Sequence, residues 1–110
     1  MNQPTKLSGV IAATVLPLTD DAEPDLDSYA SFLDDLVSAG VGGLAVNCDS
    51  GEAMSLWPAQ RRDVMRTAAE VGAGRVPIVG GIIASFTEQA QRLAEESVAD
   101  VCFVNFKPAI

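Results

Sequence analysis

The stretch that decides the fold spans residues 76–104 and has the sequence VPIVGGIIASFTEQAQRLAEESVADVCFV. It begins with an apolar run, continues with apolar residues at three- and four-residue steps, and ends with a second apolar run at 101–104. Short apolar runs rich in β-branched residues predict buried strands, and the intervening period predicts a helix. The stretch therefore predicts a strand, a helix and a second strand, which is the unit of a parallel sheet.

Two local signals refine this unit. Gly80 and Gly81 lie inside the first strand, expected at 76–83, and mark a place where a side chain is not wanted. Ser85 and Glu88 have the spacing of a capping box, so we expect the helix to begin there and to run to about Ala99.

The same alternation of patterns extends toward the N-terminus. Asp25 precedes a helical apolar pattern as a candidate N-cap, Gly40 follows it as a stop, and Pro58 fits the first turn of a later helix. The expected elements before residue 76 are a strand at 10–16, a helix at 25–39, a strand at 43–47 and a helix at 58–72. The order is β-α-β-α-β-α-β with parallel strands, which is an α/β fold.

An open doubly wound sheet and a (β/α) barrel both fit this order. The glycine clusters at 40–43 and 72–74 lie where a helix runs into a strand, whereas a nucleotide-binding loop lies where a strand runs into a helix. The short, evenly spaced units favour a barrel, although a complete one needs about 250 residues. We therefore expect residues 1–110 to be a single partial domain, the N-terminal half of a (β/α)8 TIM barrel truncated after the fourth strand.

Charge and composition exclude several kinds of function. The chain has 7 Lys and Arg against 15 Asp and Glu, no His and a net charge of -8, so nucleic acid and anionic membranes are unfavourable partners. Without His, the Ser-His-Asp triad and His-containing metal sites are ruled out within this chain. No cofactor is expected.

The cysteines and the N-terminus predict a cytoplasmic protein. Cys48 and Cys102 are far apart and form no CxxC pair, as is usual for thiols in a reducing compartment. The apolar segment 9–18 is interrupted by Thr14 and Pro17, which argues against a signal peptide. The side chains expected in the core are those of Ile11, Val15, Leu33, Leu44, Val46, Ile78, Val79, Leu93, Val101 and Phe103.

Three segments carry a family resemblance. They are GVIAATVLPLTDDAEPDLDSYASFLDDLVSAGVGGLAVN at 9–47, Ser50-Gly51-Glu52 with the following Ser55-Leu56, and RVPIVGGI at 75–82. In this order they resemble the N-terminal part of the dihydrodipicolinate synthase and N-acetylneuraminate lyase family. The resemblance implies a (β/α) barrel in which a lysine forms a Schiff base with a 2-oxo acid such as pyruvate, and that lysine lies beyond the end of this sequence.

The resemblance also implies a carboxylate-binding motif after the second strand. The family has Gly-Thr-Thr-Gly-Glu there, and this chain has Cys48-Asp49-Ser50-Gly51-Glu52. Ser50 keeps a hydroxyl that can hold the carboxylate of an oxo acid, and it is the expected catalytic residue of the loop. Asp49 instead brings a negative charge, so it is protonated, turns outward or accompanies a different substrate. Asp49, Ser50 and Gly51 are the expected substrate-binding residues, unless they form a simple turn.

Lysine and aromatic residues complete the list of candidates. A Schiff base needs an amine, and the chain has only Lys6, before the first strand, and Lys107, after the fourth. Lys107 is the one catalytic candidate among them, with Phe106 beside it as a pocket wall, although a surface lysine near a chain terminus is the simpler interpretation. The proton-relaying tyrosine of the family is absent, because Tyr29 lies on the first helix. Asp49 and Glu52 are too few ligands for a metal, and Glu52 is expected to anchor the loop by hydrogen bonds to backbone amides.

Two functions remain open. The first is a lyase or aldolase acting on a 2-oxo acid, with its lysine supplied from outside this stretch. The second is a half-barrel module without activity of its own. In both cases four strands leave open sheet edges, so we expect a homo-oligomer or completion by a missing half barrel.

Overall fold

A computed structural model describes residues 5–106 of the chain. Its strands are β1 (Ile11–Ala13), β2 (Gly43–Val46), β3 (Ile78–Ala84) and β4 (Val101–Phe106). Its helices are α1 (Leu26–Ser38), α2 (Pro58–Gly72) and α3 (Thr87–Glu96), with two 3₁₀ turns, η1 (Asp49–Gly51) and η2 (Ala53–Ser55), between β2 and α2. The alternation predicted from the sequence is confirmed.

The strands form one parallel sheet in the order β1-β2-β3-β4. Each strand pairs with the next one along the chain, for example with Ala45 opposite Val79 and Gly81 opposite Phe103. A doubly wound sheet reverses its strand order partway, whereas a barrel adds strands in sequence. The sheet therefore has the topology of the first half of a barrel.

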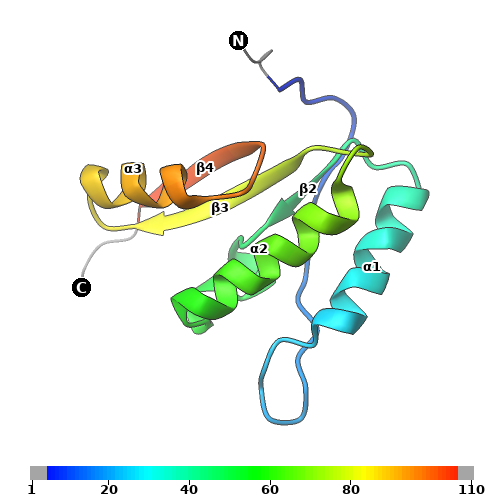
Figure 1. Ribbon diagram of the computed structural model, residues 1–110, viewed down its shortest axis with the longest axis horizontal. Helices are drawn as coiled ribbons and strands as arrows, with labels where there is room; N and C mark the ends of the chain where they lie inside the picture. The colour runs from blue at the N-terminus through cyan, green and yellow to red at the C-terminus, as the bar shows by residue number, and fades with distance from the viewer. Residues whose placement is uncertain (1–4, 107–110) are drawn as a thin grey trace.

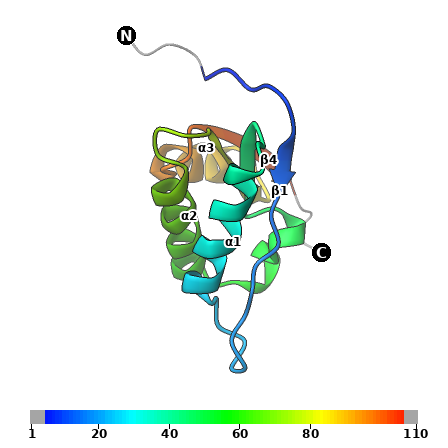
Figure 2. The same ribbon diagram turned by 90° about the vertical axis from the view of Figure 1, so that its right-hand side faces the viewer.

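All three helices cover the same face of the sheet. Ile78 of β3 belongs to the core cluster that α1 and α2 cover, while Ile82 and Ala84 of the same strand contact Ala90 of α3. Alternate residues of a strand point to one face, so the even-numbered side chains of β3 all face helices. Figures 1 and 2 show α1 and α2 side by side, with α3 over β3 and β4. Within the described range, the opposite face of the sheet has no helix against it.

The predicted core is confirmed for half of its members. Leu33, Leu44, Val46, Ile78 and Val79 are buried, while Ile11, Leu93 and Val101 are half-buried. The prediction that Val15 and Phe103 are buried is wrong. Val15 is 54% exposed because strand pairing ends at Ala13, and Phe103 is 37% exposed because β4 is an edge strand and this side chain lies on the helix-free face.

Helix ends follow the sequence signals in the first two helices only. The Asp25 carboxylate accepts a hydrogen bond from the Ser28 amide (3.1 Å), and Pro58 opens α2, as predicted. The predicted capping box at Ser85 is wrong: Phe86 has extended backbone and precedes the first helical residue, and the Ser85 amide donates to Gln89 Oε1 (2.9 Å). The helix also ends at Glu96, before the predicted Ala99. No helix within residues 5–106 is long and apolar enough to cross a membrane.

The two glycines of β3 are required for close packing on both faces, as predicted. A Cβ on Gly80 would lie 2.8 Å from Ala99 Cβ and 3.0 Å from Met65 Cε. A Cβ on Gly81 would collide with the backbone carbonyl of Asn47 on the other face. The absence of side chains here lets β3 approach both α2 and the end of β2.

Candidate functional site

The candidate loop is the segment between β2 and α2, which contains η1 and η2, and it lies at the carboxyl end of the strands. Asp49, Ser50 and Gly51 form η1, in which the Gly51 amide donates to Cys48 O (3.1 Å). The carboxyl ends of strands are where parallel α/β folds place their sites. Phe106 ends β4 at the same edge and is exposed, but β3 separates that strand from the loop. Lys107, the predicted lysine candidate, lies outside the described residues.

Ser50 fastens the loop to the end of β1. Its Oγ donates a hydrogen bond to the backbone carbonyl of Thr14, at 3.1 Å. Gly51 is buried beside this contact, and a Cβ on it would lie 3.2 Å from the same Thr14 oxygen. A larger residue than glycine would press on this carbonyl, so the loop is packed closely against β1.

Thr14 is in turn held by a tyrosine from α1. The Tyr29 hydroxyl lies 2.7 Å from Thr14 Oγ1, which also donates to Ala45 O at 3.3 Å. Both side chains are almost fully buried. Burial raises the pKa of Tyr29 to about 12, with the Thr14 hydrogen bond acting in the opposite direction. The phenol therefore stays protonated at neutral pH and keeps a proton to donate.

Cys48 and Glu52 flank the loop without the chemistry of a nucleophile or a metal site. Burial raises the pKa of the Cys48 thiol, and the Asp49 charge adds to this effect, so the neutral thiol is favoured. Glu52 has an exposed side chain and a φ of 60°, and its backbone amide donates to Asp49 O at 3.0 Å. It shapes the loop through its backbone, not through the predicted carboxylate contacts. The described residues contain no group of three or more Cys, Asp and Glu side chains able to hold a metal.

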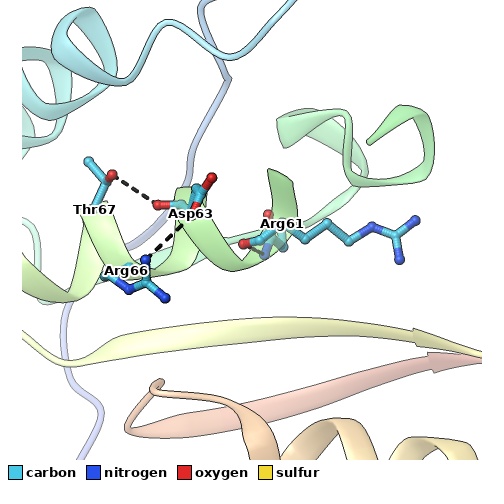
Figure 3. A network of polar contacts seen from close by, with 5 residues as sticks. Arg61, Asp63, Arg66 and Thr67 are labelled. Atoms are coloured by element: carbon cyan, nitrogen blue, oxygen red, sulfur yellow. Dashed lines mark hydrogen bonds and ion pairs between the residues drawn. The ribbon is translucent and has the colours of Figure 1, made fainter. Parts of the chain in front are cut away.

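The far end of the loop is braced by α2. Arg61 Nε donates to Ala53 O at 2.7 Å, and Asn47 Nδ2 donates to Arg61 O at 3.0 Å. Figure 3 shows the Arg61 side chain extending away from the contacts among Asp63, Arg66 and Thr67 on the same helix. The loop is thus tied to β1 at Ser50 and to α2 at Ala53.

A cavity of about 240 Å³ lies between α2 and α3. Arg61, Arg62 and Arg66 line it on one side and Glu96 on the other. Asn47 also lines it, and its buried Oδ1 has no hydrogen-bond partner among the described residues. This cavity contains none of the site residues predicted from the sequence, and its arginines contrast with the acidic chain as a whole.

Sequence reasoning missed the residues that support the loop. In the sequence, Thr14 is only an interruption of an apolar run, and Tyr29 is only a residue of the first helix. One signal was available, because a hydroxyl in an otherwise apolar strand needs a buried partner. Asn47 and Arg61 gave no comparable signal, since their contacts run through backbone carbonyls.

Most of the chain matches the model of one known protein family. Residues 6–102 match the model of the dihydrodipicolinate synthetase family. A probable 5-dehydro-4-deoxyglucarate dehydratase from Streptomyces avermitilis is 38% identical over 106 residues, covering 90% of this chain and 32% of that protein. A 4-hydroxy-tetrahydrodipicolinate synthase from Xanthomonas axonopodis pv. citri is 39% identical over 75 residues, which are 68% of this chain and 25% of that enzyme.

Solved structures of the same family superpose on this chain. A dihydrodipicolinate synthase superposes with a TM-score of 0.80 at 28% identity, over 87% of this chain and 34% of its own. A prophage protein of the same family from E. coli K12, solved in complex with pyruvate, has a TM-score of 0.78 at 29% identity, over 87% of this chain and 33% of its own. The chain thus has the N-terminal half of this TIM-barrel fold and spans about a third of the length of the relatives it matches.

Proposed function

Because the chain belongs to the dihydrodipicolinate synthetase family, we propose that it supplies the substrate-binding loop of a Schiff-base lyase or aldolase acting on a 2-oxo acid. Asp49, Ser50 and Gly51 bind the oxo acid, Ser50 is the loop's catalytic residue, and the Schiff-base lysine comes from outside this sequence. The family match over residues 6–102, which includes the whole loop, carries the proposal.

Several features support this function. The loop lies at the carboxyl end of the strands and is fixed from both sides, as a site that must hold a small ligand requires. One relative is named a dehydratase and another a synthase, and a third was solved with pyruvate bound. Lys6 is exposed and precedes β1, at the opposite end of the sheet from the loop. It is therefore a poor Schiff-base residue.

Ligand binding by the loop is tested on the chain itself. Pyruvate is titrated into the 110-residue protein while backbone amide resonances are followed by NMR. We expect the shifts to concentrate on Ser50, Gly51 and Glu52, with Gly74, in the turn between α2 and β3 at the opposite end of the sheet, as the internal control. The absence of shifts in the loop at saturating pyruvate and at other 2-oxo acids would contradict the proposal.

The origin of the lysine is tested by trapping. The chain is incubated with pyruvate and borohydride, its intact mass is measured, and the Lys107→Ala variant is treated in parallel. We expect no adduct on the chain alone, because the Schiff-base lysine is proposed to come from outside this sequence and Lys6 is exposed before β1. An adduct that disappears in the variant would overturn the external origin of the lysine and make Lys107 the catalytic residue.

The alternative function is that of an interaction module without activity. Its support is the surface of β4, where Phe103, Val104 and Phe106 are all exposed at an open sheet edge. Such an edge binds a further strand, from a second copy or from a separate half barrel. Light scattering on the purified chain separates the cases: a dimer mass indicates self-association through this edge, and a monomer that binds no oxo acid removes both functions for the isolated chain.

A further inference from the structure

The arginines of this acidic chain occur in two different settings. Arg75 and Arg92 each lie within ion-pair distance of a carboxylate, at 2.7 and 3.7 Å. Arg61, Arg62 and Arg66 instead line the cavity between α2 and α3. Of these three, only Arg66 has an ion-pair partner among the residues that the structure describes, an exposed carboxylate of its own helix at 3.5 Å. Because arginines bind anions through charge-assisted hydrogen bonds, this wall of the cavity favours an anionic ligand.

Helical spacing places two of these guanidinium groups on one wall. Residues three and four apart lie on the same face of a helix, so Arg62, Met65 and Arg66 share the face of α2 that lines the cavity. Met65 is buried, whereas both arginine side chains are exposed and can be reached from solvent. Arg61 also lines the cavity, but its Nε already donates to Ala53 O, and its side chain extends away from Arg66 (Figure 3). Arg62 and Arg66 therefore form the anion-binding part of the cavity.

Two arginines on one wall favour a phosphate group over a carboxylate. A carboxylate has two oxygens, and a single guanidinium can bind both of them. A phosphate monoester has three acceptor oxygens and a charge of about −1.5 to −2 at neutral pH, so it can bind two guanidinium groups at once. The contact between Arg66 and Asp63 does not prevent this, because exposed ion pairs at 3.5 Å contribute little stability and are easily replaced.

The rest of the cavity presents hydrogen-bond acceptors. Glu96 of α3 lies across from the arginines, and Asn47 lines the same cavity from the end of β2. The buried Oδ1 of Asn47 has no donor among the described residues. Buried acceptors in native proteins almost always have a donor, so this oxygen marks a place where one is missing. A ligand with hydroxyl groups beside its phosphate can supply donors to this wall, whereas a second anionic group would be repelled by Glu96.

We infer that the cavity between α2 and α3 binds a small phosphate monoester that carries hydroxyl groups. The phosphate contacts Arg62 and Arg66. The hydroxyl groups donate to Glu96 and to Asn47 Oδ1. The cavity volume of about 240 Å³ is below the range of about 300–1,000 Å³ that is usual for drug-sized ligands, so the ligand has the size of a three-carbon phosphate ester. The site uses no residue of η1, and the inference does not depend on the proposed function.

The first test compares three probes that each contain part of this ligand. Glycerol 3-phosphate, inorganic phosphate and glycerol are titrated separately into the full 110-residue chain, and dissociation constants are taken from the amide shifts of α2 and α3. We expect glycerol 3-phosphate to bind about tenfold more tightly than inorganic phosphate, because its hydroxyl groups add a hydrogen bond to a charged acceptor. Glycerol should not bind measurably. If inorganic phosphate binds as tightly as the ester, or if no probe binds, the inference is overturned.

Three exposed substitutions locate the binding. Arg62→Gln should weaken binding of glycerol 3-phosphate about tenfold, because a charge-assisted hydrogen bond is lost. Arg92→Gln removes the same charge from an exposed position outside the cavity and should leave the dissociation constant unchanged. Glu96→Gln should reduce the preference for the ester over inorganic phosphate to about threefold, because the acceptor loses its charge. Circular dichroism checks that each variant is folded. Equal weakening by Arg62→Gln and Arg92→Gln would show attraction of anions to the whole surface and would overturn the site.

Discussion

The sheet is packed very differently on its β1–β2 side, called here the packed end, and on its β3–β4 side, called the loose end. Around β1 and β2, side chains from α1 and α2 close a continuous core in which Leu33, Leu44 and Val46 have no exposed surface. Around β3 and β4, the buried cluster consists only of Ile82, Ala84 and Ala90, with Leu93 and Cys102 partly covered. The candidate loop belongs to the well-packed end.

This contrast indicates which part of the chain is stable by itself. Apolar burial stabilises a fold in proportion to the area removed from water, so the β1–β2 end contributes most of the folding free energy. The β4 end carries exposed apolar side chains, including Phe106. It gains stability only when another surface covers it, and its amides should exchange with solvent faster than those of β2.

The largest expected effect comes from opening the packed end. Leu33→Ala should lower the free energy of unfolding by about 2–5 kcal/mol, because it leaves a cavity in a closed core. The matched change Leu93→Ala, in the half-buried cluster under α3, should cost less than about 1.5 kcal/mol. Urea unfolding followed by circular dichroism measures both. Equal losses would show that the two ends are equally well packed, against the comparison.

A smaller effect is expected where the two ends meet. Gly81→Ala places a methyl group against the Asn47 carbonyl and should cost about 1–3 kcal/mol, because two backbones must separate. Gly74→Ala serves as the control, because nothing lies near the position that the new Cβ would take. Its left-handed backbone alone should make the alanine variant less stable by about 1 kcal/mol. The same unfolding experiment measures both. If the Gly81 variant were as stable as the Gly74 variant, the contact with the Asn47 carbonyl would not be the source of strain.

The buried hydroxyl of the packed end gives a pH test. Tyr29 is the only tyrosine of the chain, so its ionisation is visible in the near-ultraviolet absorbance. Its pKa is raised from 10.0 to about 12 in the folded protein, so the folded state holds this proton more firmly than the unfolded state. Stability should be complete below pH 10 and fall as the pH rises toward 12.

Tyr29→Phe is the matched variant for this pH test. It should lose about 1 kcal/mol at neutral pH and the part of the alkaline dependence that comes from Tyr29. Normal titration of Tyr29 near pH 10 in the folded chain would show that it is accessible to solvent.

The smallest effect concerns the helix starts. The N-cap residue of α1 is Asp25, whose side chain caps the helix, whereas the N-cap residue of α3 is Phe86, which makes no side-chain cap. Phe86→Asp should therefore stabilise the loose end by about 0.5–1 kcal/mol. Thermal unfolding and hydrogen exchange of α3 amides measure the gain, with Phe106→Asp as the control for simple removal of an exposed aromatic. A gain no larger than that of the control would exclude capping as its cause.

The order of elements was predictable because it depends on local periodicity. Asp25, Pro58 and Gly40 also act within one turn of themselves, and their roles were confirmed. The capping box at Ser85 failed because Gln89, one position beyond the predicted Glu88, makes the side-chain contact with the Ser85 amide. A motif defined by spacing does not say which of two neighbouring side chains completes it.

The candidate loop was predictable only as a position along the chain. The resemblance located Asp49, Ser50 and Gly51, but the partner of Ser50 is a carbonyl 36 residues away. That contact, and the one between Thr14 and Tyr29, depends on how β1, β2 and α1 pack together. Whether these residues bind substrate stays a prediction. The exposure of Val15 depends on the end of strand pairing at Ala13, and that of Phe103 on the position of β4 at the edge of the sheet.

The chain-order arrangement of the sheet has a consequence for how the protein is made. Within the described residues, β2, β3 and β4 each pair with the strand that precedes them, so none of these pairings has to wait for a distant part of the sequence. On the ribosome, β1, α1, β2 and α2 can assemble while later residues are still being synthesised. The hydroxyl contacts under the loop, all contributed by residues up to Ser50, are then complete before β4 emerges, and synthesis itself delivers the well-packed end first.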